Sequence, residues 1–310
     1  MNNKKIVGGI SPLLLLCTSL IWGFAFVAQS ASSALGAFTI CAIRHCLGAI
    51  FLILIIPLLD KITGNGRRLW RKAADGTPPF TKRELIGGAY IGAALALAGA
   101  LQQLGMNNGT DPGKSAFISA LYVVVVPIFS LAVKKKSPFN VWVGVLVATI
   151  GFYVLCVDKS FNVELCDLLV FFSACGFALH IMIIGHFSPS CDGVRLSAVQ
   201  FTVAGAVNCI LALIFDSPIS FVKIAESFLP LLYLGIMSGG VAYTLQIIGQ
   251  KHTKPAAASL ILSLESVFGA VFSALAFGKF LSLREYIGGG IVFLAVIISQ
   301  LNFKPINIKK

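Results

Sequence analysis

The sequence predicts an all-α integral membrane protein with ten transmembrane helices, arranged as two inverted five-helix repeats around a central cavity. Its composition, ten apolar segments and an internal repeat support this fold. Of the 310 residues, 57% are hydrophobic and 12% are charged, and the mean hydropathy is +0.91. Soluble domains usually carry about 25% charged residues, and disordered chains are poor in apolar residues. The composition therefore argues against both classes.

Ten apolar segments have about the length that a membrane-spanning helix needs, roughly 20 residues. Because backbone polar groups must be paired inside a bilayer, we expect each segment to be a helix. Together the segments leave no room for a soluble domain. Their expected ranges are 10–30, 36–58, 85–105, 114–133, 139–157, 165–185, 194–214, 228–249, 255–277 and 285–303.

The lysine and arginine residues predict the orientation. If the N-terminus is cytoplasmic, 18 of them lie in cytoplasmic segments and 5 in external ones. Cytoplasmic loops of membrane proteins carry such an excess, so we expect both termini on the cytoplasmic side of the cell membrane. The same bias accounts for the net charge of +12 without nucleic acid as a partner. The basic loop 59–84 is either an ordinary cytoplasmic loop or a contact for anionic lipid.

The two halves of the chain resemble each other at an offset of about 144 residues. Residues 101–105 (LQQLG) match residues 245–249 (LQIIG), and after a one-residue gap Pro112 matches Pro255. We therefore expect repeats over 1–157 and 165–303, each of five helices. Because five is odd, the second repeat enters the membrane from the opposite side. Many secondary transporters have this arrangement, with the substrate site near the midplane.

Two charged side chains fall inside predicted spans, Arg44 in the second and Glu265 in the ninth. Such groups cost roughly 2.5–3.5 kcal/mol or more at membrane depth and usually mark a pathway. Arg44 is a candidate to bind a substrate carboxylate, to pair with Glu265, or to clamp helices through carbonyl groups. Glu265 is a candidate proton site, cation contact or structural carboxyl. We expect His45 to be a packed histidine.

The ninth span presents two polar faces. Ser259, Ser263, Ser266 and Ser273 follow helical spacing and form one small polar stripe. Glu265 lies about 100° away from Ser266 around the helix. The sequence leaves open which of the two faces lines the cavity.

Further polar and aromatic side chains near mid-span complete the predicted site. The repeat mates Gln102 and Gln246 suit two symmetric gates, or hydrogen bonds between helices. An apolar cavity needs a few such groups to orient a small molecule, although each is also common in ordinary packing. The predicted substrate-binding residues are Trp22, Arg44, Gln102, Tyr122, His180, Tyr243, Gln246 and Glu265.

Glycine pairs predict close helix contacts. Gly88 with Gly92, and Gly235 with Gly239, are G-x-x-x-G pairs, which allow two helices to approach closely. Gly144 and residues 288–290 suit either packing within the chain or a homodimer, and the sequence does not decide between them.

Four segments resemble the EamA type of the drug/metabolite transporter superfamily. Residues 22–27 (WGFAFV) resemble the W-G-x-x-F-V segment of its first span, and residues 38–44 (FTICAIR) resemble the start of its second. Residues 113–127 (GKSAFISALYVVVVP) are similar to its first-half signature, and residues 264–268 (LESVF) to the L-E-P-V of its ninth span. The resemblance covers essentially the whole chain. It implies ten helices, a central cavity, and export or exchange of a small metabolite.

Two positions depart from the family pattern. Ser266 stands where the family often has proline, and Lys279 stands where glutamate is common. No role of that glutamate is therefore carried over to this chain.

These observations predict a secondary transporter that exports a small metabolite, with an amino acid as the best candidate. No Walker A motif is present, so ATP would not drive it directly, and proton coupling stays open. The alternatives are a membrane-embedded enzyme acting on lipid-linked substrates, or a sensor or scaffold without transport. An enzyme would need clustered acid, base or metal groups, and the four histidines show no metal-binding spacing. We expect no enzymatic activity, cofactor or metal.

Overall fold

The computed structural model describes residues 3–63, 67, 69, 71–73, 75–134, 137–156, 164–278 and 282–301. Some lysine and arginine residues used to predict the orientation lie outside these ranges. They are Arg68, Lys135, Lys136, Lys159, Lys279, Lys304, Lys309 and Lys310. Throughout the described ranges the regular structure is helical, and no β-strand occurs there.

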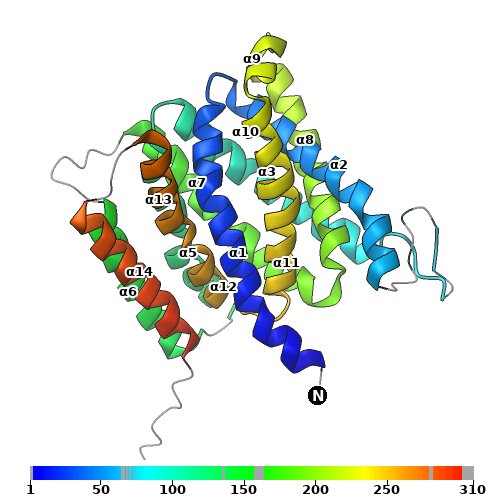
Figure 1. Ribbon diagram of the computed structural model, residues 1–310. Helices are drawn as coiled ribbons and strands as arrows, with labels where there is room; N and C mark the ends of the chain where they lie inside the picture. Colours follow the sequence, from blue (N-terminus) through cyan, green and yellow to red (C-terminus); the bar gives the residue numbers. More distant parts are fainter. Residues whose placement is uncertain are drawn as a thin grey trace, which may run out of the picture.

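The helices follow one another along the chain with mostly short connections, the longest being that between α2 and α3 (Figure 1). They are α1 (Asn3–Ala31), α2 (Ala37–Thr63), α3 (Lys82–Asn107), α4 (Pro112–Ala120), α5 (Tyr122–Ala132), α6 (Phe139–Cys156), α7 (Leu165–Phe187), η1 (Ser188–Ser190), α8 (Gly193–Phe215), α9 (Phe221–Glu226), α10 (Phe228–Tyr233), η2 (Leu234–Tyr243), α11 (Thr244–Gln250), α12 (Pro255–Leu262), α13 (Glu265–Phe277) and α14 (Leu283–Gln300).

Eight helical segments in the described ranges are long and apolar enough to cross a membrane. They comprise α1, α2, α3, α4 with α5, α7, α8, α10 to α11, and α12 with α13. Two shorter apolar helices, Phe139–Val154 and Tyr286–Ser299, lie in α6 and α14. Each of the ten predicted segments corresponds to one of these helices or helix groups, which confirms an all-α membrane fold.

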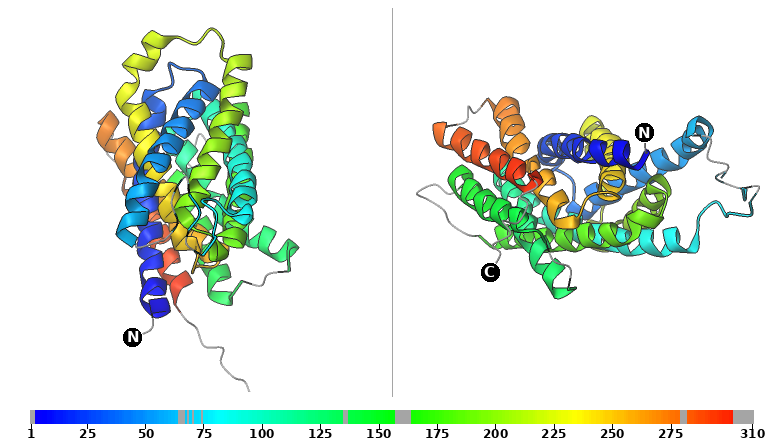
Figure 2. Two further views of the ribbon diagram at one scale, coloured as in Figure 1. Left: turned by 90° about the vertical axis from the view of Figure 1, so that its right-hand side faces the viewer. Right: turned by 90° about the horizontal axis from the view of Figure 1, so that it is seen from below.

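The packing pairs helices of the first half of the chain with helices of the second half. α6 lies along α14, and α2 lies along α8. α3 packs against α7 and α8, while α1 packs against α11, α12 and α13. The described ends of α1 and α14 that are nearest the chain termini lie at the same end of the bundle (Figures 1 and 2).

Two segments are interrupted midway, at matching positions of the two halves. Between α4 and α5, Leu121 has φ −61° and ψ −13°. Between α12 and α13, Leu264 has φ −60° and ψ −14°, and it lies at the position that the repeat assigns to Leu121. In the second break, Ser263 and Ser266 donate their hydroxyls to carbonyl groups three residues earlier, a bond that competes with helical pairing.

Glycines lie where helices touch, as the G-x-x-x-G pairs predict. A Cβ on Gly92 of α3 would lie 2.5 Å from the Gln200 carbonyl oxygen of α8. A Cβ on Gly235 of η2 would collide with Leu47 of α2. These close approaches leave no space for larger side chains.

The glycines of α6 and α14 have different environments. A Cβ on Gly144 would lie 3.0 Å from the Ala295 carbonyl oxygen, so this glycine serves packing within the chain. A Cβ on Gly290 would meet nothing within 4 Å. A homodimer stays a prediction.

A buried ion-pair network joins α2, α3 and α8 at the end where α2 finishes. Arg195 of α8 donates to Asp60 at 2.6 Å, and Arg67 pairs with Glu84 at 2.6 Å. Both arginines also donate to the Pro79 carbonyl oxygen. Hydrogen bonds to Glu84 raise the pKa of Arg67. Arg195 is one of the 18 cations predicted to lie on the cytoplasmic side. Its side chain is only 1% exposed, because it is enclosed by these partners.

Candidate functional site

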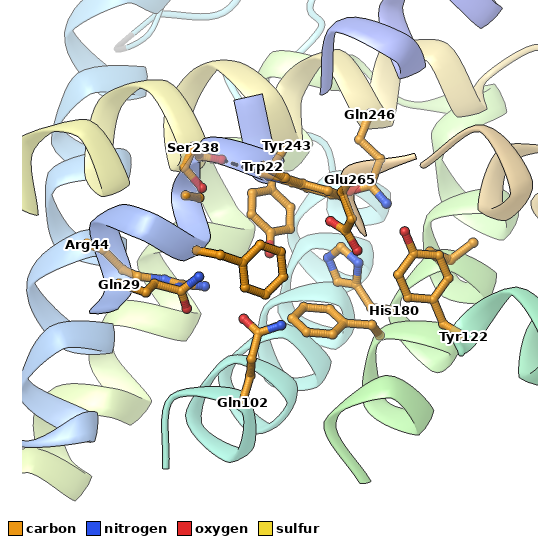
Figure 3. A pocket seen from close by; sticks show the side chains of 14 residues that line it. Trp22, Gln29, Arg44, Gln102, Tyr122, His180, Ser238, Tyr243, Gln246 and Glu265 are labelled. Carbon is orange, nitrogen blue, oxygen red and sulfur yellow. Dashed lines mark hydrogen bonds between the residues drawn. The ribbon is translucent and has the colours of Figure 1, made fainter. Parts of the chain in front are cut away.

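A pocket with about 440 Å³ of space not filled by atoms, partly open to solvent, lies inside the bundle (Figure 3). Side chains of α1, α2, α3, α5, α7, η2, α11 and α13 line it. The structure brings together all eight residues predicted to bind substrate, and that role stays a prediction. The full lining is Trp22, Ala25, Phe26, Gln29, Arg44, Gln102, Tyr122, Phe177, His180, Ile181, Ser238, Tyr243, Gln246 and Glu265.

Arg44 lies on one side of the pocket and is 5% exposed. Its Nη1 donates to Gln29 Oε1 at 3.2 Å, and its Nε donates to His45 Nε2 at 3.4 Å. Within the described part of the chain, no carboxylate forms an ion pair with Arg44. The considered pairing with Glu265 is therefore not made, and the guanidinium charge has only neutral partners.

His45 accepts a hydrogen bond from Arg44 but is not among the residues that line the pocket. It is fully buried, and its Nδ1 lies 3.4 Å from Asn208 Nδ2. Its ring centroid lies 5.6 Å from that of Phe201. The expected packed histidine is thus present, and it also supports Arg44.

Glu265 lies on the other side of the pocket, at the first position of α13 (Figure 3). It is 5% exposed and forms no ion pair with any described residue. The Tyr122 hydroxyl is near enough to interact with its carboxyl group, yet this hydroxyl has no hydrogen bond of good geometry. Both side-chain amide atoms of Gln246 are also buried without a partner. Several polar groups therefore meet here with unused hydrogen-bonding capacity.

Aromatic rings connect the two sides of the pocket. The ring centroids of Trp22 and Tyr243 are 4.6 Å apart, and Trp22 Nε1 donates to the Ser238 carbonyl oxygen at 3.2 Å. The His180 ring lies edge-on to Tyr243 at 5.6 Å. His180 Nε2 is 3.1 Å from Gln200 Oε1, which holds the ring in place.

The repeat mates Gln102 and Gln246 line this one pocket from opposite sides (Figure 3). Gln102 Nε2 donates to Ser119 Oγ at 2.8 Å, so this glutamine joins α3 to α4. Gln246 has no such partner. Hydrogen bonding between helices therefore describes Gln102, whereas Gln246 is free to contact a ligand.

The ninth span also shows which of its polar faces borders the pocket. Glu265 lines it, whereas Ser259, Ser263 and Ser266 are buried and donate to backbone carbonyls of their own segment. Lys279, the second departure from the family pattern, lies outside the described residues.

Sequence reasoning missed two polar lining residues, Gln29 and Ser238. A signal for Gln29 was present, because Trp22, Ala25, Phe26 and Gln29 follow the i, i+3, i+4, i+7 spacing of one helix face. Ser238 had no such signal. It precedes Tyr243 by five residues, which an α-helix places about 140° apart.

Outside the pocket, we searched the described residues for close thiols and for groups of metal-binding side chains. The Sγ atoms of Cys46 and Cys209 are 3.6 Å apart across α2 and α8. Among the residues that the structure describes, no group of three or more His, Cys, Asp and Glu side chains could hold a metal ion.

A bundle of long apolar helices around a pocket lined by buried ionisable side chains is the architecture of a multi-pass membrane protein. Residues 9–157 and 164–301 each match the EamA-like transporter family. The chain therefore belongs to this family, as its motifs indicated.

Two further similarities extend over nearly the whole chain. An "uncharacterized transporter" of Archaeoglobus fulgidus is 29% identical over 297 residues, which cover 94% of this chain and 86% of the relative. One solved crystal structure of a protein superposes with a TM-score of 0.71 at 14% identity, covering 94% of this chain and 96% of the other. The second similarity concerns the fold alone.

Proposed function

We propose that this protein is a secondary transporter that exports a small metabolite from the cell by alternating access, with an amino acid as the best candidate. The observation that carries the proposal is that Arg44 and Glu265 line one pocket without ion-pair partners in the described structure. Ionisable side chains without partners are costly in a bundle core. A polar ligand that binds them offsets this cost.

The proposed mechanism rests on two inverted repeats, 1–157 and 165–303. The matching helix breaks at Leu121 and Leu264 support it. So does the packing, because the contacts of α3 with α7 and α8 have counterparts in those of α1 with α11 and of α2 with η2. Two similar halves can pack in two mirrored ways, one open inward and one open outward.

The orientation belongs to the same proposal. Both termini are cytoplasmic, and the host membrane is the cell membrane, as the excess of lysine and arginine in the loops indicates. Under this orientation, the ion-pair network of Asp60 and Arg195 lies at the cytoplasmic end of α2 and α8.

Metabolite profiling of the growth medium tests the proposal. Cells express the wild type, Glu265→Gln or Ser266→Ala at equal membrane levels. Ser266 is a matched control because it is the adjacent buried residue and bonds to its own helix. We expect one metabolite to accumulate outside with the wild type and Ser266→Ala, and about tenfold less with Glu265→Gln.

The profile can also contradict export. If all three media match that of cells with an empty vector, while uptake of a labelled amino acid mixture rises with the wild type, the direction is inward. If a metabolite is bound by the purified protein but moves in neither direction, the sensor or scaffold alternative is favoured.

A further inference from the structure

The polar groups of the pocket are divided between the two halves of the chain. Gln29 and Arg44, on the left in Figure 3, come from α1 and α2 of the first half. Gln246 and Glu265, on the right, come from α11 and α13 of the second half. Two lining residues cross this division: Tyr122 of α5, from the first half, lies beside Glu265, and Ser238 of η2, from the second half, lies on the left. The pocket thus has a basic pole and an acidic pole on different repeats.

The basic pole is suited to an anionic group. Gln29 and His45, the hydrogen-bond partners of Arg44, are both uncharged acceptors, so they orient the guanidinium without neutralising it. Gly99 packs closely against the guanidinium, since a Cβ there would lie 3.3 Å from Arg44 Nη2, and Arg44 itself lines the pocket. A guanidinium held in one orientation binds a carboxylate through two parallel hydrogen bonds.

The acidic pole is suited to an ammonium group. An ammonium donates three hydrogen bonds. Glu265 supplies carboxyl oxygens, and the buried, unpartnered Gln246 Oε1 and Tyr122 hydroxyl supply further acceptors. Because neither Gln246 Oε1 nor the Tyr122 hydroxyl has a hydrogen bond of good geometry in the protein, a ligand can bond to both without displacing one.

We infer that the substrate is zwitterionic and bridges the two repeats, with its anionic group on Arg44 and its cationic group on Glu265. This inference rests on the proposed transport function and narrows its substrate class. The aromatic rings of Trp22 and Tyr243 then contact the middle of the bound molecule. A molecule with only one charged end leaves the opposite pole unpaired in the bundle core, and it is bound more weakly.

The test uses transport into proteoliposomes that contain the purified full-length protein. An equimolar mixture of the twenty L-amino acids first identifies the one that is moved fastest. This amino acid is then compared with its methyl ester, which lacks the carboxylate, and its N-acetyl derivative, which lacks the ammonium group. We expect the wild type to move the free amino acid at least about tenfold faster than either derivative, because each loses a hydrogen-bonded charge.

Two variants test which charged group of the substrate binds at each pole. Arg44→Gln is expected to lose the preference for the free amino acid over the methyl ester, but to keep the preference over the N-acetyl derivative. Glu265→Gln is expected to show the reverse. Ser266→Ala on α13 and the exposed Lys61→Ala on α2 are controls that keep both preferences. A misfolded variant loses both preferences together, so the reciprocal pattern separates a binding role from a structural one.

Three other outcomes would contradict either the zwitterion inference or the proposed transport function. If an amino acid and both derivatives are moved equally, the zwitterion inference is wrong and the transporter remains. If no amino acid is moved and the exported metabolite found in the medium carries fewer than two opposite charges, the inference is again wrong while export stands. If neither assay detects any transport, the proposed function itself is wrong.

Discussion

Arg44 combines features that rarely coexist in a structural arginine. It is buried, it has two neutral hydrogen-bond partners, and it borders open space. We expect Arg44→Ala to reduce export at least about tenfold, since it removes a charged hydrogen-bonding group from the proposed site. The measurement is the efflux rate at equal membrane expression, with Lys61→Ala on the same helix as control. Equal rates for the two variants would remove Arg44 from the binding site.

Individual residues show which parts of the site could be predicted from the sequence and which could not. A charged or polar residue at mid-span stands out, so all eight predicted residues are found at the pocket. Their partners were not visible, because the bond between Gln29 and Arg44 depends on how α1 and α2 pack. Likewise, nothing in the spacing of Gln102 and Gln246 shows that only Gln102 is bonded to a neighbouring helix.

Helix contacts at glycine give a prediction about stability. Gly92→Ala places a Cβ 2.5 Å from the Gln200 carbonyl oxygen, so α3 and α8 must separate. We expect a loss of about 1–3 kcal/mol, the usual cost of overpacking, and a lower Tm in detergent. The matched control is Gly290→Ala in α14, where a Cβ meets nothing and the gain in helix propensity is expected to keep or raise the Tm. Similar Tm values for both variants would contradict the close contact.

The ion-pair network gives a second prediction at the scale of elements. Asp60→Asn leaves the Arg195 guanidinium, 1% exposed, without its 2.6 Å carboxylate partner. We expect a destabilisation of about 3–5 kcal/mol, typical of breaking a buried pair, and a clear loss of folded protein in thermal unfolding. Asp75→Asn is the control, because Asp75 is an exposed loop carboxylate whose pKa is lowered chiefly by hydrogen bonds to Thr77. An equal Tm for both variants would show that the network does not support the bundle.

Helix existence was predictable from the sequence, but helix irregularity was not. Long apolar runs identify spans because only helices satisfy their backbone groups in lipid. No comparable sequence pattern predicts the break at Leu121 or the π-helix η2. In η2, bonding from i to i+5 widens each turn, which is why Ser238 and Tyr243 border the same pocket despite their spacing. Such departures depend on tertiary packing and are common at functional sites.

For the whole molecule, the division of charge between the halves has a mechanical consequence. If the repeats 1–157 and 165–303 move against each other, the two poles of the pocket move with different halves. A substrate bound to both Arg44 and Glu265 stabilises only those conformations in which the distance between these two residues matches its own length. The sequence predicts the repeat through its matching motifs. It does not predict the division of charge, because Arg44 and Glu265 do not occupy equivalent positions in the two halves.

The proposed inverted arrangement predicts, for each loop, on which side of the membrane it lies. Asp75 lies between the second and third predicted spans, and Glu226 lies between the seventh and eighth; both are exposed. With a cytoplasmic N-terminus, the first loop is internal and the second external.

In a background without the native cysteines, we expect a membrane-impermeant maleimide on intact cells to label Glu226→Cys but not Asp75→Cys. Opening the cells should make both reactive. Labelling of Asp75→Cys alone would contradict the predicted orientation and place both termini outside. Labelling of both in intact cells would mean that an even number of spans separates the two loops, and the ten-span topology with its inverted halves would have to be abandoned.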